Sequence, residues 1–101
     1  MEKIYIIGDI HTVTVFRLGG VEGAVAASDA APEALGALMS RDDAGIILIT
    51  RELAEATGEM IRDCNLNRVK PVIVEIPGIT DPRGFGRSIM SYITEALGIS
   101  F

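Results

Sequence analysis

The feature that most constrains the fold is an unbroken run of four large aliphatic residues at positions 46–49. Three of the four side chains are β-branched, a turn-forming Asp43 and Gly45 lie before the run, and Thr50, which suits a helix N-cap, follows it. A short apolar run bounded in this way is typical of a strand buried on both faces. Such strands occur in parallel sheets covered by helices, so the run predicts an α/β protein with this strand near its centre.

The rest of the chain alternates between strand-like and helix-like patterns. Further strand patterns occupy residues 3–9, 21–27 and 71–76. Helix patterns occupy residues 12–18, 32–42, 50–67 and 87–97, with Gly58 inside the third. This alternation predicts a four-stranded parallel sheet of order 2-1-3-4 with helices on both faces, as in flavodoxin-like and receiver domains.

A four-stranded version of this fold is expected to be incompletely covered. The first helix covers one face alone and is short, whereas the second and third helices cover the other face. The last helix or a partner must therefore cover the remainder of the first face. The fourth strand lies at an edge of the sheet, where unpaired backbone groups invite another chain.

Composition excludes several classes of function. The 101 residues suffice for one domain, and a net charge of −5 argues against a nucleic-acid partner. A single cysteine, Cys64, excludes an internal disulfide and falls on the apolar stripe of a helix, where a buried inert thiol is expected. No segment has the length and apolarity of a membrane span, and the amino terminus lacks a signal-peptide pattern, so we expect a cytoplasmic location without membrane insertion.

The carboxyl ends of the strands are where ligands bind in such sheets, and here they carry Asp9, His11 and Thr50. A receiver domain would need an acidic pair, an aspartate after the third strand and a lysine near the last, and a flavodoxin would need a glycine- and hydroxyl-rich phosphate loop. Neither pattern is present. We interpret Asp9 as a cap and His11 as an exposed turn residue, and we expect no catalytic residue, metal or cofactor. Two alternatives stay open: a ligand- or nucleotide-sensing domain using the Asp9, His11 and Thr50 rim, and a degenerate receiver that dimerises.

The last predicted helix is more apolar than one core-facing stripe requires. Packing on the sheet accounts for Ile89, Tyr92, Ile93 and Ala96, but it leaves Met90, Leu97, Ile99 and Phe101 without a place in the core. Surplus apolar surface on a small domain marks an interaction site, so we predict a protein interface on this helix.

The chain also resembles the F subunit of the A-type/V-type rotary ATP synthases. The resemblance covers the whole chain and rests on the order of four segments, which are residues 7–9 (Ile-Gly-Asp), residues 12–21 (Thr-Val with Phe-Arg-Leu-Gly-Gly-Val), residues 44–50 (Ala-Gly-Ile-Ile-Leu-Ile-Thr) and residues 71–78 (Pro-Val-Ile-Val-Glu-Ile-Pro-Gly). It implies a non-catalytic central-stalk subunit that binds the coiled-coil D subunit of the stalk and rotates with it inside the catalytic A/B hexamer. Such a subunit is peripheral to the membrane, and its mobile carboxyl-terminal helix can regulate ATP hydrolysis by changing position.

These expectations define two parts of the chain and a set of site residues. Residues 1–78 are predicted to form the α/β domain, and residues 79–101 the linker and carboxyl-terminal helix. The predicted protein interface comprises Arg17, Phe85, Arg87, Ile89, Met90, Ile93, Leu97 and Phe101. The predicted hinge comprises Pro77, Gly78, Pro82, Gly84 and Gly86.

Overall fold

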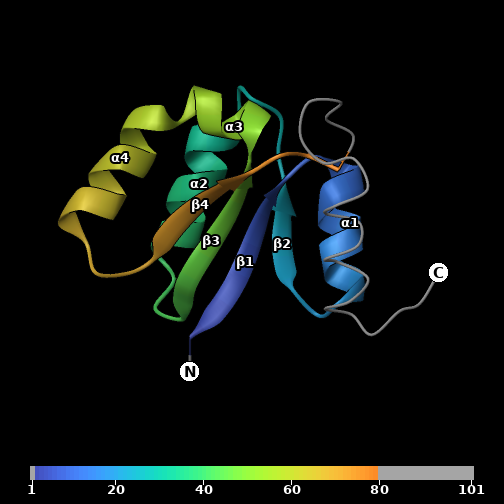
Figure 1. Ribbon diagram of the computed structural model, residues 1–101, viewed down its shortest axis with the longest axis horizontal. Coiled ribbons are helices and arrows are strands. Elements are labelled where there is room, and N and C mark those ends of the chain that lie inside the picture. Colours follow the sequence, from blue (N-terminus) through green and yellow to red (C-terminus); the bar gives the residue numbers. More distant parts are fainter. Residues whose placement is uncertain (1, 80–101) are drawn as a thin grey trace.

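The computed structural model describes residues 2–79, and in this part of the chain strands and helices alternate as predicted. The elements are β1 (Lys3–Gly8), α1 (Ile10–Leu18), β2 (Glu22–Val25), α2 (Ala31–Met39), β3 (Ala44–Thr50), α3 (Arg51–Ala56), α4 (Gly58–Asn67) and β4 (Val72–Ile76). The predicted parallel sheet is confirmed, with the strands in the order β2-β1-β3-β4 (Figure 1).

One face of the sheet is closed by α2, α3 and α4, and α2 lies behind the strands in the view of Figure 1. Ile7, Ile47, Ile49 and Ile73 project into this side and are buried together with Leu35, which comes from α2. Fully burying an aliphatic side chain of this size stabilises a fold by about 1.5–3 kcal/mol. This side of the sheet therefore contains the main hydrophobic core.

On the opposite face α1 packs over β1 and β2. Val13 is completely buried there beside Ile6, and the small residues of β2 allow this close approach, because a Cβ at Gly23 would lie 3.1 Å from a Val13 methyl. The helix ends at Leu18, as predicted, and its carboxyl end forms a Schellman motif. The N–H groups of Val21 and Gly20 donate to the carbonyls of Phe16 and Arg17, and Gly20 has φ of 88°, a conformation that favours glycine.

The prediction of a single helix after Thr50 is wrong. The structure contains two helices in this region, α3 and α4, which are separated at Thr57. The Thr57 hydroxyl donates to the Leu53 carbonyl at 2.9 Å, and the Thr57 backbone leaves the helical region with φ of −127°. Gly58, which the sequence places inside the predicted helix, begins α4. Glycine in a helix interior is destabilising relative to alanine, which favours the break at this point. Thr50 holds the N-cap position of α3, but its side chain makes no capping hydrogen bond.

The fourth strand lies at an edge of the sheet as predicted, but side chains occupy some of the backbone groups at both edges. At the outer edge of β4, the Asn65 amide donates to the Ile73 carbonyl and its oxygen accepts from the Ile73 N–H, each at 2.9 Å. At the edge of β2, Arg17 donates to the Gly23 carbonyl at 3.0 Å. Asn65 thus imitates a neighbouring strand, so a partner that adds a strand would first have to displace it.

Replacing Asn65 with alanine is expected to lower the free energy of unfolding by about 1–2 kcal/mol, because two hydrogen bonds to the edge of β4 are lost. Urea unfolding followed by circular dichroism measures the change. Asn67→Ala is the matched control, since the Asn67 side chain donates only to Asp63 on the surface of α4, and its effect should stay within about 0.5 kcal/mol. Equal effects of the two substitutions would contradict the role given to Asn65.

Candidate functional site

The most distinctive surface of the described chain is the part of the sheet beside α1, over β1, β3 and β4. The strand register places Ile4, Ile46 and Val72 side by side in one row, and Ile6, Leu48 and Val74 in the next. Ile6 is covered by α1, but Ile4, Ile46, Val72 and Val74 are 46%, 38%, 47% and 41% exposed, and Leu48 is half-buried. We call Ile4, Ile46, Leu48, Val72 and Val74 the open face.

The open face corrects the interpretation of the central strand as buried on both sides. Ile47 and Ile49 are buried under the helices, whereas Ile46 points to the other side of the same strand and stays exposed. The expectation that the short first helix leaves part of this face uncovered is confirmed for residues 2–79. Contiguous exposed aliphatic side chains on a small domain mark a contact surface for protein.

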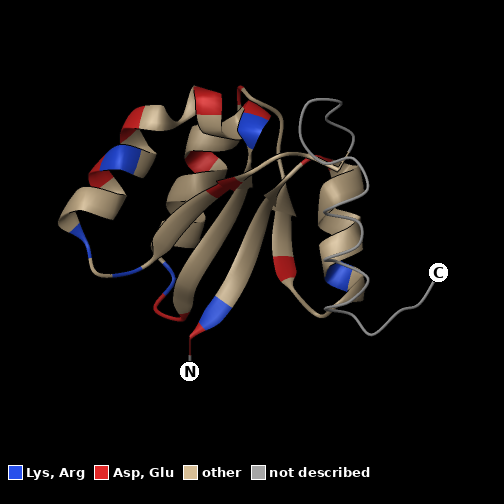
Figure 2. Ribbon diagram, viewed as in Figure 1, with Lys and Arg blue, Asp and Glu red and all other residues tan. Residues whose placement is uncertain are grey.

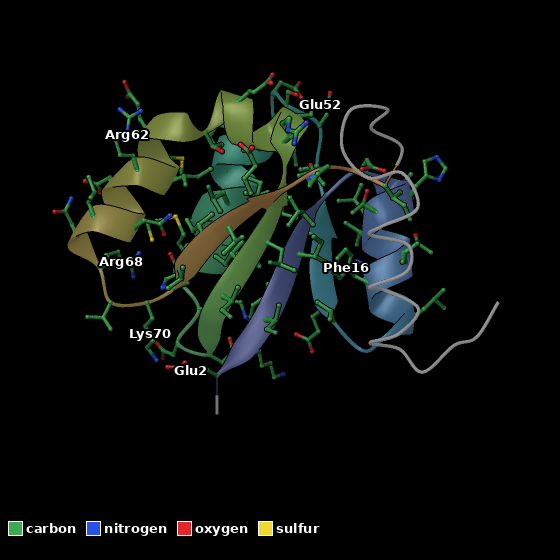
Figure 3. The ribbon with its side chains drawn as sticks, in the orientation of Figure 1. Glu2, Phe16, Glu52, Arg62, Arg68 and Lys70 are labelled. Carbon is green, nitrogen blue, oxygen red and sulfur yellow. The ribbon has the colours of Figure 1, made fainter. Side chains whose placement is uncertain are left out.

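Charged side chains border the open face and lie on the helices, while the centres of β1 and β3 carry no charge (Figure 2). At the amino ends of the strands, Lys70 pairs with Glu2 at 3.4 Å (Figure 3). At the carboxyl end, Arg51 lies 3.8 Å from Glu75, but Glu75 is the register partner of the buried Ile49, so this pair belongs to the helix-covered side of the sheet. The open face is therefore an apolar surface without an acidic or basic side chain at its centre.

At the carboxyl ends of the strands, a short hydrogen-bond chain joins three segments. The Asp9 carboxylate accepts from the backbone N–H groups of His11 and Thr12 at 3.1 Å, which caps α1. The Thr12 hydroxyl donates to Asp9 at 2.6 Å and accepts from the Ile79 N–H at 3.0 Å. The predicted role of Asp9 as a cap is confirmed, and Ile79 is bonded to the first turn of α1.

The same contacts perturb the acidity of Asp9. Partial burial acts to raise the pKa of this carboxyl, but the hydrogen bonds from the Thr12 hydroxyl and from nearby backbone N–H groups outweigh burial and lower the pKa below its ordinary value. Asp9 is therefore a carboxylate at neutral pH. A negative group already occupies the helix N-terminus, the place at which phosphates bind in many α/β proteins.

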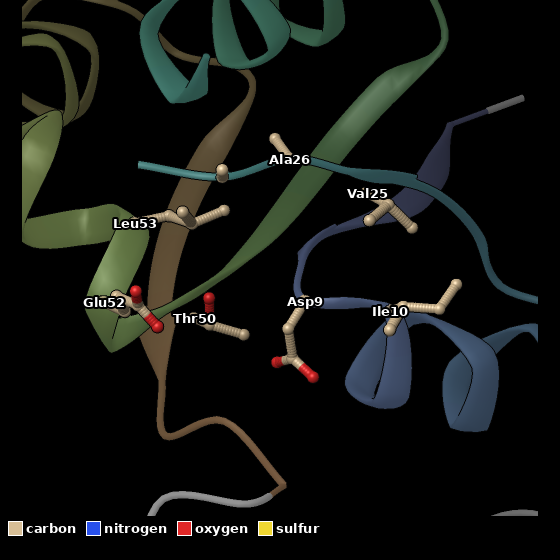
Figure 4. Close-up of a pocket in the computed structure, with 8 residues that line it drawn as sticks. Asp9, Ile10, Val25, Ala26, Thr50, Glu52 and Leu53 are labelled. Atoms are coloured by element: carbon tan, nitrogen blue, oxygen red, sulfur yellow. The ribbon is translucent and has the colours of Figure 1, made fainter. Parts of the chain in front are cut away.

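A hollow of about 310 Å³ lies beside Asp9 at the carboxyl ends of the strands, between the end of β2 and the start of α3 (Figure 4). It is lined by Asp9, Ile10, Val25, Ala26, Ala27, Thr50, Glu52 and Leu53. The predicted rim is thus brought together only in part, because Asp9 and Thr50 line the hollow and His11 does not. His11 is exposed as expected, but it lies in the first turn of α1 and not in a turn, because the Asp9 cap starts the helix at Ile10. The two acidic side chains in its lining oppose an anionic ligand, so the hollow does not suit a nucleotide phosphate.

Replacing Asp9 with asparagine is expected to remove a pH-dependent part of the stability. Asparagine caps a helix about as well as aspartate, so the substitution removes the charge and keeps the cap. A carboxyl whose pKa is lowered on folding adds stability above its unfolded pKa, and this stability is lost as the pH falls through the folded pKa. The excess stability of wild type over Asp9→Asn should therefore shrink between about pH 7 and about pH 3 in urea titrations. A difference that stays constant with pH would contradict the lowered pKa.

A second polar cluster at the opposite end of the sheet was not predicted. The buried Tyr5 hydroxyl donates to Asp43 at 2.8 Å, and Arg41 donates to both the Tyr5 oxygen and the Asp43 carboxylate, at 2.8 and 3.1 Å. The bonds from Arg41 and Tyr5 lower the pKa of Asp43, while burial and the neighbouring carboxylate raise the pKa of Tyr5. Each group has a partner inside the cluster, so its role is to join β1 to the turn before β3.

The predicted interface and hinge are only partly within the described residues. Of the predicted interface, Arg17 is exposed on α1, and its guanidinium donates a hydrogen bond to the Gly23 carbonyl. Of the predicted hinge, Pro77 and Gly78 are half-buried after the end of β4. The other predicted positions lie outside the described residues, namely Pro82, Gly84, Phe85, Gly86, Arg87, Ile89, Met90, Ile93, Leu97 and Phe101. The predicted division at residue 78 also falls at the end of the described part. Within residues 2–79, no helix is long and apolar enough to cross a membrane.

Comparison with known proteins places these features in a family. Residues 4–93 match the family model described as ATP synthase (F/14-kDa) subunit. The A-type ATP synthase F subunit of Methanothermobacter thermautotrophicus is 41% identical over 82 residues, which cover 79% of this chain and 76% of the relative. The F subunit of Thermococcus kodakarensis is 33% identical and covers 96% of this chain and 95% of its own, and that of Pyrococcus furiosus is 42% identical over 74% of each. The resemblance noted from the sequence is confirmed, and the chain belongs to the family of ATP synthase (F/14-kDa) subunits, as a component of an A-type ATP synthase.

Proposed function

We propose that this protein is a non-catalytic central-stalk subunit that binds the coiled-coil D subunit through its open face and rotates with it. The single observation that carries the proposal is the exposure of Ile4, Ile46, Val72 and Val74 on a sheet that is otherwise covered by helices. A family member that works inside a multi-subunit complex needs such a contact surface. The rim of Asp9 and Thr50, by contrast, offers no group suited to catalysis on a nucleotide.

The dimensions of the open face suit a helix. Strands β1, β3 and β4 are neighbours, so the distance from the first to the third is about 10 Å, which is close to the diameter of one α-helix. Helix α1 already packs on the adjoining part of the same face. A coiled coil would therefore lay one of its helices beside α1 and over the exposed aliphatic rows.

The sheet edges argue against the main alternative mode of binding. A partner that adds a strand needs free backbone groups along an edge. Asn65 occupies those of Ile73, and Arg17 occupies the carbonyl of Gly23. Binding across the face is thus favoured over binding along an edge.

The carboxyl-terminal segment is proposed to contact the coiled coil and the A/B subunits and to regulate ATP hydrolysis or synthesis by changing position. Of the predicted hinge residues, the hinge would comprise Pro82, Gly84 and Gly86, because Gly78 lies against Asp9 and the Ile79 N–H donates to Thr12, while Pro77 before them is half-buried. The whole assembly would be peripheral to the cell membrane on the cytoplasmic side.

A binding experiment with helix variants tests this part of the proposal. Ile93→Asp and Leu97→Asp should weaken the complex with the coiled-coil partner at least tenfold, because each places a charge on an apolar contact surface. Titration calorimetry measures the affinity, and circular dichroism checks that the sheet stays folded. Unchanged affinity in both variants would remove the last helix from the interface.

A further inference from the structure

We propose that the hollow at the carboxyl ends of the strands binds a small organic cation, an alkylammonium whose charged end lies between Asp9 and Glu52 and whose hydrocarbon chain lies along the apolar part of the lining. This site goes beyond the proposed function, because it does not use the open face. It also narrows the alternative left open by the sequence, in which the rim of Asp9, His11 and Thr50 senses a ligand or nucleotide.

Two acidic side chains give the hollow a negative charge. Asp9 follows β1 and Glu52 lies in the first turn of α3, and Figure 4 shows them on either side of Thr50. None of the ion pairs within residues 2–79 involves either carboxylate, and no basic side chain lines the hollow. A bound cation would be attracted by both carboxylates without displacing an existing partner.

The Thr50 hydroxyl is a polar group that lacks a partner in the described chain. Thr50 is 3% exposed and lines the hollow, but its side chain makes no capping hydrogen bond to α3 and none to any other group of residues 2–79. In Figure 4 the hydroxyl oxygen points into the hollow, towards the side of Leu53. Polar groups so well buried are normally hydrogen-bonded, and an ammonium in the hollow would donate to this oxygen.

The position of Thr50 is fixed by close packing. A Cβ at Gly8 would lie 2.5 Å from the Thr50 methyl and 3.2 Å from its hydroxyl oxygen, so the side chain is held tightly against the end of β1. A polar group that is held in place before a ligand arrives loses little conformational freedom on binding. The hydroxyl is therefore a prepared contact for a donor.

The rest of the lining is apolar. Ile10 comes from α1, Val25 from β2 and Leu53 from α3, and Ala26 and Ala27 follow β2. Ile10 and Val25 are half exposed, so a hydrocarbon chain lying against them would remove apolar surface from water. Ligand sites usually combine apolar walls with a few polar groups, and the volume of about 310 Å³ lies at the lower end of their range of about 300–1,000 Å³.

Other classes of ligand fit the hollow less well. A hard metal ion such as Ca²⁺ takes about six to eight oxygen ligands, whereas the side chains of the lining offer two carboxylates and one hydroxyl. An anion would be repelled by the same carboxylates, and Glu52 already provides a negative charge in the first turn of α3. A cation with a short hydrocarbon chain satisfies both the charged and the apolar parts of the lining.

Titration of the full-length chain with putrescine, a four-carbon diamine, tests the site by methyl NMR. We expect saturable shifts of the methyl signals of Ile10, Val25 and Leu53 in about 0.15 M salt, which screens non-specific attraction to an acidic protein. Succinate has the same chain length and the opposite charge, so it should give no saturable shift.

Two substitutions test the polar groups of the site. Glu52→Gln should raise the Kd for putrescine about fivefold, because one of two carboxylates is lost. Thr50→Val should raise it about threefold or more, because the hydroxyl acceptor is lost while the shape is kept. Glu55→Gln is the matched control, since Glu55 is exposed on the same helix and does not line the hollow, so its Kd should equal that of wild type.

Three results would overturn the proposal. The first is the lack of saturable shifts of these methyl signals with putrescine. The second is an equal loss of affinity in Glu52→Gln and Glu55→Gln, which would show non-specific attraction to the acidic surface only. The third is equal affinity of Thr50→Val and wild type, which would remove the hydroxyl from the site. None of these results bears on binding of the coiled coil, so this site and the proposed function can fail independently.

Discussion

Replacing Ile47 with alanine is expected to lower the free energy of unfolding by about 2–5 kcal/mol. Ile47 is 0% exposed and lies at the centre of the core beneath α2 and α3, where truncation removes apolar contacts and leaves a cavity. Urea or thermal unfolding of the purified protein measures the loss. In a domain of this size such a change is a large fraction of the total stability.

Ile46→Ala in the same strand is the control for this prediction. Ile46 differs from Ile47 by one position and therefore points to the open face, where it is 38% exposed. Truncation of Ile46 should lower the free energy of unfolding by about 1 kcal/mol, since less apolar surface returns to water than at Ile47 and no enclosed cavity forms. Equal losses for the two variants would contradict the asymmetry of the sheet.

Replacing Val74 with lysine is expected to weaken binding of the coiled-coil partner tenfold or more. Val74 is 41% exposed in the free domain, so lysine is tolerated there, but in a complex across the open face its charge would be buried without a partner. A tenfold change in Kd corresponds to about 1.4 kcal/mol, which is less than the cost of burying an unpaired charge. Calorimetric titration measures the affinity.

Leu66→Lys provides the comparison, because it adds the same charge at an exposed leucine on α4, away from the open face. Its affinity should match that of wild type. If both lysine variants bound equally well, the partner would not use the open face, whatever the role of the carboxyl-terminal segment.

Much of the fold could be predicted from local patterns. The aliphatic run at residues 46–49, the end of the first helix at residue 18 and the alternation of strands and helices depend on neighbouring residues, and they led to the correct sheet order. The incomplete cover of one face also followed from counting helices. These features succeed because periodicity and turn chemistry are properties of short segments.

The errors arose where distant residues decide the structure. Four consecutive aliphatic side chains suggest burial on both faces of the sheet. In the structure Ile46 is exposed and Leu48 is half-buried, because no helix within residues 2–79 covers them. The Asn65 side chain is hydrogen-bonded to Ile73, eight positions later in the sequence, and Tyr5 is hydrogen-bonded to Asp43, 38 positions later. No local pattern indicates such pairs, since each depends on how the sheet brings the segments together.

The candidate site illustrates the same division. Asp9 was correctly interpreted as a cap because an aspartate before a helix is a local signal. The Thr12 hydroxyl that donates to Asp9 also accepts from the Ile79 N–H, 67 positions away, and this link could be found only from the structure. The open face likewise became visible only when the register aligned Ile4, Ile46 and Val72 from three separate strands.

Titration of the wild-type chain into the purified coiled-coil D subunit tests the central claim most directly. If the protein is a stalk component that binds through the open face, calorimetry should show saturable binding of one chain per coiled coil, with a Kd of about 1 μM or tighter and a negative heat-capacity change from apolar burial. Absence of saturable binding, with both proteins folded, would contradict the assignment of this chain to the central stalk.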